Sequence, residues 1–223
     1  MTPAQQLHEA IKKGDLAEAK ALVSADSSLL EGGGPSGMAP LMLAVYMRQL
    51  EIASMLISKG APVDAFAAAA LGDTSRLKIM LADGEANLPE HSADGWTVLH
   101  LACFFGHPET VEMLIGLGAN VRDHSANAMM NQPLHAAAAG RNKECVSQLL
   151  AGGADVNAQQ HGGYTALHSA AANGDEEIVR MLLAHEAKTS FQSEKGQTPA
   201  DMAREKGHEN VLLLLERKPD PAS

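Results

Sequence analysis

A short phrase built around Leu-His and alanine returns along this chain at nearly constant spacing. Clear copies lie at residues 98–102, 133–137 and 166–170, and weaker copies lie at 40–44 and 199–203. The last alanine of each copy, including two less obvious ones, falls at positions 10, 44, 68, 102, 137, 170 and 203, so the steps are 34, 24, 34, 35, 33 and 33 residues. A period in this range indicates a solenoid of stacked units rather than a globule with one central core.

Within one period the apolar residues form two short helical stripes separated by a glycine. Leu99 and Ala102 lie in one stripe, Val111 and Leu114 lie in the next, and Gly106 stands between them. Glycine commonly ends a helix, and four other units carry one at the matching place. These are Gly14, Gly72, Gly174 and Gly207. A Gly-Ala pair after the second stripe, at 60–61, 118–119 and 153–154, predicts that each unit is helix, turn, helix and then a projecting hairpin-like finger.

The best-preserved stretches carry a family resemblance. Residues 163–168, Gly174, Leu182-Leu183 and residues 153–158 are similar to the consensus of the ankyrin repeat, and the resemblance covers about residues 3–217. It implies an all-α solenoid of about seven helix-turn-helix units in a single domain, 1–217, whose first and last units are caps. The units start near residues 3, 36, 65, 92, 127, 161 and 194. We expect residues 218–223 to form a flexible tail.

The step of 24 residues is the one large departure from the period. Val63-Asp64 runs directly into Ala65, so the third finger is missing, and Asp64 is placed to cap the following helix. The resulting notch could receive a partner or let the stack bend. A tolerated deletion in a surface connection explains it equally well.

Composition limits the classes of partner. The formal net charge of −10 argues against a nucleic-acid binder, which needs Lys and Arg to neutralise phosphates. Residues 65–125 are the most acidic part, with 3 basic and 8 acidic side chains. No stretch approaches the roughly 20 apolar residues that span a bilayer, and the N-terminus lacks the pattern of a signal peptide. Cys103 and Cys145 lie in different units and are expected to be small, reduced core residues, which predicts a cytoplasmic protein.

Ten histidines invite a metal or catalytic interpretation. His100, His135 and His168 stand in the repeated phrase, with His8 at the same offset in the first unit. The resemblance implies that these imidazoles tie the backbones of adjacent fingers together. His91, His124 and His161 lie about one repeat apart in finger segments, but no Cys or carboxylate accompanies them at ligand spacing. We expect neither a metal nor a cofactor.

Other chemical motifs are absent from the sequence. The glycine-rich stretch 31–37 has no following Lys-Ser/Thr and no preceding strand, so it predicts the first finger rather than a phosphate cradle. No nucleophile motif or carboxylate pair stands out, so we expect no enzymatic activity. Asn157 matches a position that asparaginyl hydroxylases modify in animal members of the family. A purely structural bond to the finger backbone is the preferred interpretation.

The scarce aromatic residues are the informative ones for function. The resemblance implies that partners contact the residue before each Thr-Pro turn and the residues before the glycine that ends the first helix. Five of the seven aromatic residues fall on such positions. Phe104 has an alternative interpretation, as a residue that leans on the next unit. The candidate partner-binding residues are Met38, Tyr46, Met47, Leu71, Trp96, Phe104, Phe105, Met129, Met130, Asn131 and Tyr164.

These residues predict a monomeric, non-enzymatic protein-interaction module. A protein or peptide would lie in its concave groove and against its finger tips, centred on Trp96, Phe104 and Phe105. The acidic middle favours a basic partner with apolar anchors. Two alternatives stay open: a scaffold that self-associates through the same patch, and a regulatory or inhibitory subunit of an enzyme.

Overall fold

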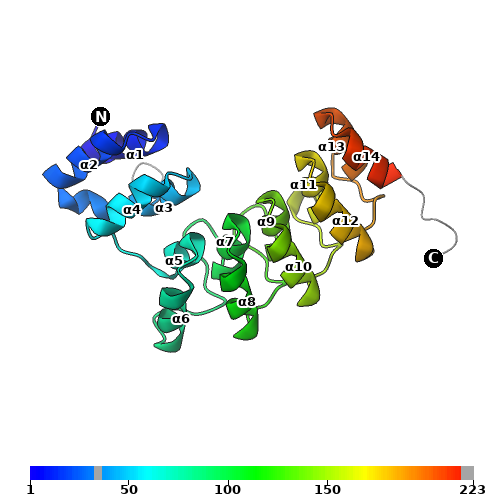
Figure 1. Cartoon of the computed structure of the whole chain (residues 1–223), viewed down its shortest axis with the longest axis horizontal. Helices are drawn as coiled ribbons and strands as arrows, with labels where there is room; N and C mark the ends of the chain where they lie inside the picture. The colour runs from blue at the N-terminus through cyan, green and yellow to red at the C-terminus, as the bar shows by residue number, and fades with distance from the viewer. Residues whose placement is uncertain (33–36, 217–223) are drawn as a thin grey trace. The chain divides into compact units, whose positions relative to one another are not determined.

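The computed structural model describes residues 1–32 and 37–216, and over these residues it is built from helices alone (Figure 1). The helices follow one another in seven consecutive pairs, as the repeat predicts. The all-α fold class is therefore confirmed. The tip of the predicted first finger, 33–36, and the predicted tail, 218–223, lie outside the described residues.

The chain divides into two compact units, Met1–Leu71 and the residues from Gly72 onward. The boundary falls inside the third repeat, between its two helices. That residues 1–217 form a single domain therefore stays a prediction. The elements of the first unit are α1 (Pro3–Lys13), α2 (Leu16–Ala25), η1 (Ser27–Leu30), α3 (Pro40–Tyr46), α4 (Leu50–Ser58) and α5 (Ala65–Leu71).

The second unit stacks its helices in two rows. The first helices pack in the order α7, α9, α11, α13, and the second helices pack in the order α6, α8, α10, α12, α14 (Figure 1). Leu, Val and Ala side chains fill the seam between the rows. The elements are α6 (Thr74–Ala82), α7 (Val98–Phe105), α8 (Pro108–Gly116), α9 (Pro133–Ala139), α10 (Lys143–Ala151), η2 (His161–Gly163), α11 (Ala166–Asn173), α12 (Glu176–Ala184), α13 (Pro199–Lys206) and α14 (Glu209–Glu216).

The connection that precedes α5 is much shorter than the others. It comprises residues 59–64, whereas residues 83–97, 117–132, 152–165 and 185–198 connect the later pairs. The Asp64 carboxylate accepts the Ala67 amide at 2.7 Å, as a helix N-cap does. The expected loss of the third finger and the capping role of Asp64 are both present in the structure.

A residue with left-handed backbone conformation follows each of the seven first helices. Gly14, Gly106, Gly174 and Gly207 adopt φ of 72°, 83°, 73° and 74°, and Gly72 adopts 73°. At the two matching positions without glycine, Arg48 and Arg141 adopt the same conformation, with φ of 55° and 64°. A side chain with a Cβ is disfavoured there by about 1 kcal/mol or more. The turn geometry is therefore imposed by the helix pair and not by glycine alone.

We expect Arg48→Gly to stabilise the first unit by about 0.5–1 kcal/mol, because glycine relieves the left-handed strain and loses part of that gain to backbone entropy. Chemical unfolding followed by circular dichroism measures this. Arg141→Gly is the matched control: Arg141 also donates to Asp175 at 2.8–3.0 Å, so its replacement should gain less. A lower free energy of unfolding in Arg48→Gly would contradict the claim that the left-handed conformation of Arg48 is strained.

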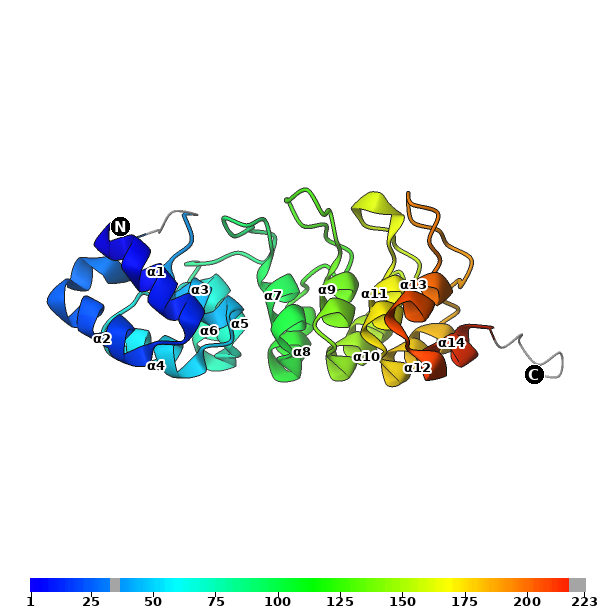
Figure 2. The same cartoon turned by 90° about the horizontal axis from the view of Figure 1, so that it is seen from above.

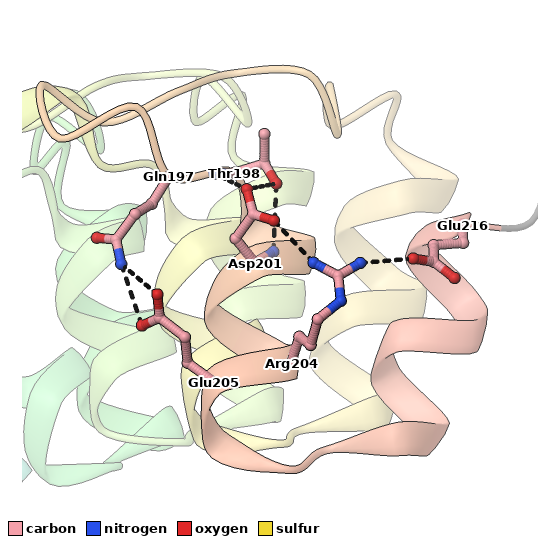
Figure 3. Close-up of polar contacts among 6 residues, drawn as sticks. All are labelled: Gln197, Thr198, Asp201, Arg204, Glu205 and Glu216. Carbon is pink, nitrogen blue, oxygen red and sulfur yellow. Dashed lines mark hydrogen bonds and ion pairs between the residues drawn. The ribbon is translucent and has the colours of Figure 1, made fainter.

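Polar contacts tie the last repeat together (Figure 3). Arg204 donates to Asp201 and to Glu216, both at 2.8 Å, and so links α13 to α14. Thr198 and Asp201 form the capping box of α13, and Gln197 donates to Glu205 at 2.9 and 3.0 Å. Arg204, Glu205 and neighbouring Lys206 are exposed, as a terminal cap requires.

Candidate functional site

The fingers of the second unit are joined into a row by their backbones. Ala126 N–H donates to the Gly95 carbonyl at 2.7 Å, and Glu194 N–H donates to the Gly162 carbonyl at 2.9 Å. Between them, His161 N–H donates to the Met129 carbonyl at 2.9 Å. Figure 2 shows these loops projecting together from the helix rows. The finger row is thus a continuous support for any side chain at its base or tip.

Histidines of the repeated phrase tie each helix to the next finger. His100 contacts Thr97 Oγ1 through Nδ1 at 2.8 Å and donates from Nε2 to the Asn131 carbonyl at 2.9 Å. The Nε2 atoms of His135 and His168 donate to the carbonyls of Ala158 and Gln197 at 2.9 and 3.1 Å. The structural role that the resemblance implies is confirmed for these three residues.

Burial holds these rings neutral. Desolvation lowers the pKa of His100 and of His135 to about 4, even though each ring has a backbone hydrogen bond that favours the charged form. Desolvation also lowers the pKa of His168. His8 is likewise buried, but its Nε2 has no hydrogen-bond partner among the described residues. These four rings therefore support the fold, and their burial leaves them inaccessible to a substrate.

Three aromatic rings form a cluster at the corner between the finger row and α7. Trp96 and Phe104 meet edge to face with their centroids 5.2 Å apart, and Phe104 and Phe105 do the same at 5.2 Å. Trp96 also lies 5.9 Å from the ring of His100. All three rings of the cluster are half-buried, so each still presents a surface. We call Trp96, Phe104 and Phe105 the aromatic cluster.

The end of α7 is held in place by the next repeat. Asn142 donates from Nδ2 to the carbonyls of Cys103 and Phe104 at 2.8 and 2.9 Å. A Cβ on Gly140 would lie only 2.2 Å from the Phe104 carbonyl oxygen, so α9 approaches α7 as closely as glycine permits. Since Ala139 beside it is exposed, small residues border the aromatic cluster on the α9 side.

The finger before α9 carries the exposed methionines. Met129 and Met130 are 48% and 55% exposed, whereas the next residue, Asn131, is only 7% exposed. The Asn131 carbonyl accepts from both Ser125 N–H and His100 Nε2, which draws the residue into the finger base. Although Asn131 matches Trp96 and Tyr164 in the repeat, it offers little surface to a partner. Tyr164 is half-buried, with its ring 5.6 Å from that of His168.

The remaining candidate residues belong to the first unit. Met47 is 43% exposed, while Met38, Tyr46 and Leu71 are half-buried. All four thus retain some accessible surface within that unit. The aromatic cluster, the exposed methionines and Tyr164 belong to the second unit. Partner contact stays a prediction for both sets.

Other polar candidates have structural partners. Asn157 donates to the Glu186 carbonyl at 3.2 Å and accepts from Lys188 N–H at 2.9 Å, which is the backbone bond expected of it. Burial raises the pKa of the Cys103 thiol, and that of Cys145 to about 11, so both stay protonated at neutral pH. Among the described residues, no three His, Cys, Asp or Glu side chains are grouped to hold a metal.

Several exposed apolar residues lie outside the set that the sequence predicted, and two of them, Ile79 and Leu117, belong to adjacent repeats of the second unit. Ile79 on α6 is 61% exposed, and Leu117 after α8 is 49% exposed. Neither belongs to a repeated motif, so the repeat pattern does not distinguish them from ordinary helix residues. Over residues 1–32 and 37–216, none of the helices combines the length and apolar character needed to traverse a bilayer.

Comparisons with known proteins agree with this architecture. A model of three ankyrin repeats matches residues 65–160 and 134–223, and a single-repeat model matches residues 36–66. Protein phosphatase 1 regulatory subunit 27 of Mus musculus is 35% identical over 110 residues, which are 49% of this chain and 55% of the relative. The putative palmitoyltransferase ZDHHC13 of Danio rerio is 33% identical over 165 residues, 72% of this chain and 21% of the relative.

The chain therefore spans about half the length of the first relative and about a fifth of the second. The named activities of these relatives belong to whole proteins of which only a part is matched. The family models match the repeats of this chain, over residues 36–66, 65–160 and 134–223. The chain belongs to the ankyrin-repeat family.

Proposed function

We propose that this protein, whose ankyrin repeats form a protein-interaction module, binds a protein or peptide against the aromatic cluster without catalysing a reaction. The carrying observation is that Trp96, Phe104 and Phe105 lie ring to ring at one corner and that each ring, being half-buried, keeps part of its surface accessible. Apolar groups that stay partly accessible together typically mark a contact surface. Such residues also concentrate binding energy.

The surroundings of the aromatic cluster favour a particular partner. Met129, Met130 and Tyr164 on the neighbouring fingers supply apolar flanks, and Gly140 lies against the backbone of Phe104 without adding a side chain there. The excess of acidic over basic side chains within residues 65–125 favours Lys or Arg around the partner's apolar anchors. The two buried, protonated thiols support a reducing, cytoplasmic location.

A peptide library displayed on phage, selected against the full chain, tests this proposal. We expect the Trp96→Ala/Phe105→Ala variant to bind the selected peptides at least about tenfold more weakly, since each anchor is worth roughly 1 kcal/mol or more. Leu213→Ala is the control, because Leu213 is 68% exposed on α14, away from the aromatic cluster. Equal binding by the double variant would refute the site.

The free energy of unfolding of the same double variant shows whether Trp96 and Phe105 are surface residues or core residues. Truncating half-exposed rings should lower the free energy of unfolding by no more than about 1–2 kcal/mol, whereas emptying a core aromatic position costs about 3–5 kcal/mol. A loss in the higher range would show that the rings serve packing and not binding.

A regulatory subunit is the second candidate function. It is favoured by the mouse relative and by the human one, which is also 35% identical over 110 residues, because both are named as regulatory subunits of protein phosphatase 1. Adding the chain to that phosphatase and measuring its activity tests this idea. If the phosphatase activity stayed unchanged at a saturating concentration of this protein, the regulatory-subunit function would be excluded. Sedimentation at several concentrations separates both functions from self-association, which would bury the aromatic cluster in a dimer.

A further inference from the structure

A hollow of about 310 Å³ lies on the row of second helices, between α6 and the end of α8. Leu81, Ala82, Ala86 and Leu88 line it from α6 and the segment that follows, and Leu117, directly after α8, closes it. Figure 1 places these helices in the row of α10 and α12, while α7, which bears Phe104 and Phe105, lies in the other row. The hollow is therefore separate from the aromatic cluster. We call it the α6–α8 groove.

Several apolar side chains at and beside the α6–α8 groove keep accessible surface, although Ala86 in its floor is buried. Leu77 supplies the fully buried contact of α6, while Ile79 two residues later is 61% exposed. Leu117, in the wall of the groove, is 49% exposed, and Leu81 and Leu88 are half-buried. Large aliphatic groups gathered at one exposed hollow indicate a surface that another chain covers.

Unpaired acidic side chains accompany this apolar surface. Asp83 follows Ala82 and Glu85 precedes Ala86, so carboxylates alternate with lining residues along the same segment. Both are exposed, and neither belongs to an ion pair within the described part of the chain, in contrast to Asp73, which contacts Arg76 at 3.5 Å. Lys78 is the cation that lines the groove. The free carboxylates favour a partner that brings Lys or Arg.

We propose that the α6–α8 groove is a second docking site, which takes an amphipathic peptide segment of a partner protein. The segment inserts aliphatic side chains between Leu81, Leu88 and Leu117 and places Lys or Arg beside Asp83 and Glu85. Its apolar stripe also covers Ile79. Because this groove and the aromatic cluster lie on different rows, the module can hold two segments at the same time.

The test uses the full chain carrying Trp96→Ala/Phe105→Ala as bait, which removes the site proposed above. A phage-displayed library of random peptides is selected on it, and the consensus peptide is synthesised. We expect that peptide to combine Leu or Ile with Lys or Arg and to bind the bait and the unmodified chain equally well. Ile79→Ser/Leu117→Ser should weaken its binding at least about tenfold, and Asp83→Asn/Glu85→Gln about threefold, with a weaker salt dependence.

Leu213→Ser is the matched control, because it makes the same change at an exposed leucine of α14. The substitutions at residues 79 and 117 replace exposed groups, so melting curves should match that of the unmodified chain within about 0.5 kcal/mol. Peptides that lack cations, or that bind Ile79→Ser/Leu117→Ser unchanged, would overturn the proposal. So would a failure to enrich any peptide, or a dimer that this variant abolishes, since the groove would then be covered by a second copy. Because the bait lacks Trp96 and Phe105, each of these outcomes would remove this second site and leave the proposal for the aromatic cluster standing.

Discussion

Replacing Gly140 with alanine is expected to destabilise the second unit by about 2–3 kcal/mol, which is the usual cost of forcing an extra group into a packed site. The new Cβ would lie 2.2 Å from the Phe104 carbonyl oxygen and 2.6 Å from Asn142 Nδ2. The oxygen belongs to the backbone, so relief requires α9 to move away from α7. That movement also weakens the hydrogen bonds of Asn142 that hold the end of α7.

Chemical unfolding followed by the fluorescence of Trp96 measures this loss, because the chain has a single tryptophan and it lies in the repeat against which Gly140 packs. Gly116→Ala is the matched control. Gly116 ends α8 with nothing within 4 Å of an added Cβ, so alanine there should be neutral or stabilise by up to about 1 kcal/mol. Equal effects of the two substitutions would mean that the close approach of α9 to α7 does not constrain the fold.

Acidification from pH 7.5 to 5.5 is expected to remove about 2–3 kcal/mol of stability through His100 and His135. Their pKa is about 4 in the folded state and about 6.5 when unfolded, so the unfolded chain binds more protons between these values. The contribution of each neutral ring is therefore complete above pH 6.5 and declines as the pH falls toward 4. At pH 5.5 the loss is about 1.3 kcal/mol for each histidine.

Urea unfolding at both pH values checks this expectation, since most carboxylates stay ionised over this range. His135→Gln should lower the stability at pH 7.5 and reduce the pH-dependent loss by about half, because one of the two protons is no longer taken up. An unchanged pH dependence in this variant would show that the ring is not excluded from protonation in the folded protein.

The sequence predicted the helix pairs of this fold better than the boundary between its two compact units. The spacing of Leu-His and glycine located seven helix pairs, because these residues have local tasks: His100 bonds a backbone and Gly106 adopts a positive φ. It did not predict that Arg48 and Arg141 take the glycine conformation, since that conformation is imposed by the helices on both sides. Nor did it predict the division after Leu71, which depends on contacts between distant residues.

The candidate site shows the same limit. The rule that the residue before the Thr-Pro turn faces a partner selected Trp96, Tyr164 and Asn131 alike. The finger of Asn131 is the longest in the second unit, and there the exposed surface passes to Met129 and Met130. The α6–α8 groove was not predicted at all, because Leu81 and Leu117 come from different repeats and each resembles an ordinary helix residue.

The backbone links of the finger row bear on how such a protein can diversify. The amide of Ala126 and the carbonyl of Met129 keep their bonds to the flanking fingers although this finger is the longest of the set. Loop length at the tip is thus uncoupled from the register of the stack. New recognition residues can therefore be inserted or exchanged one finger at a time, by natural drift or by design, while the backbone hydrogen bonds between adjacent fingers stay intact.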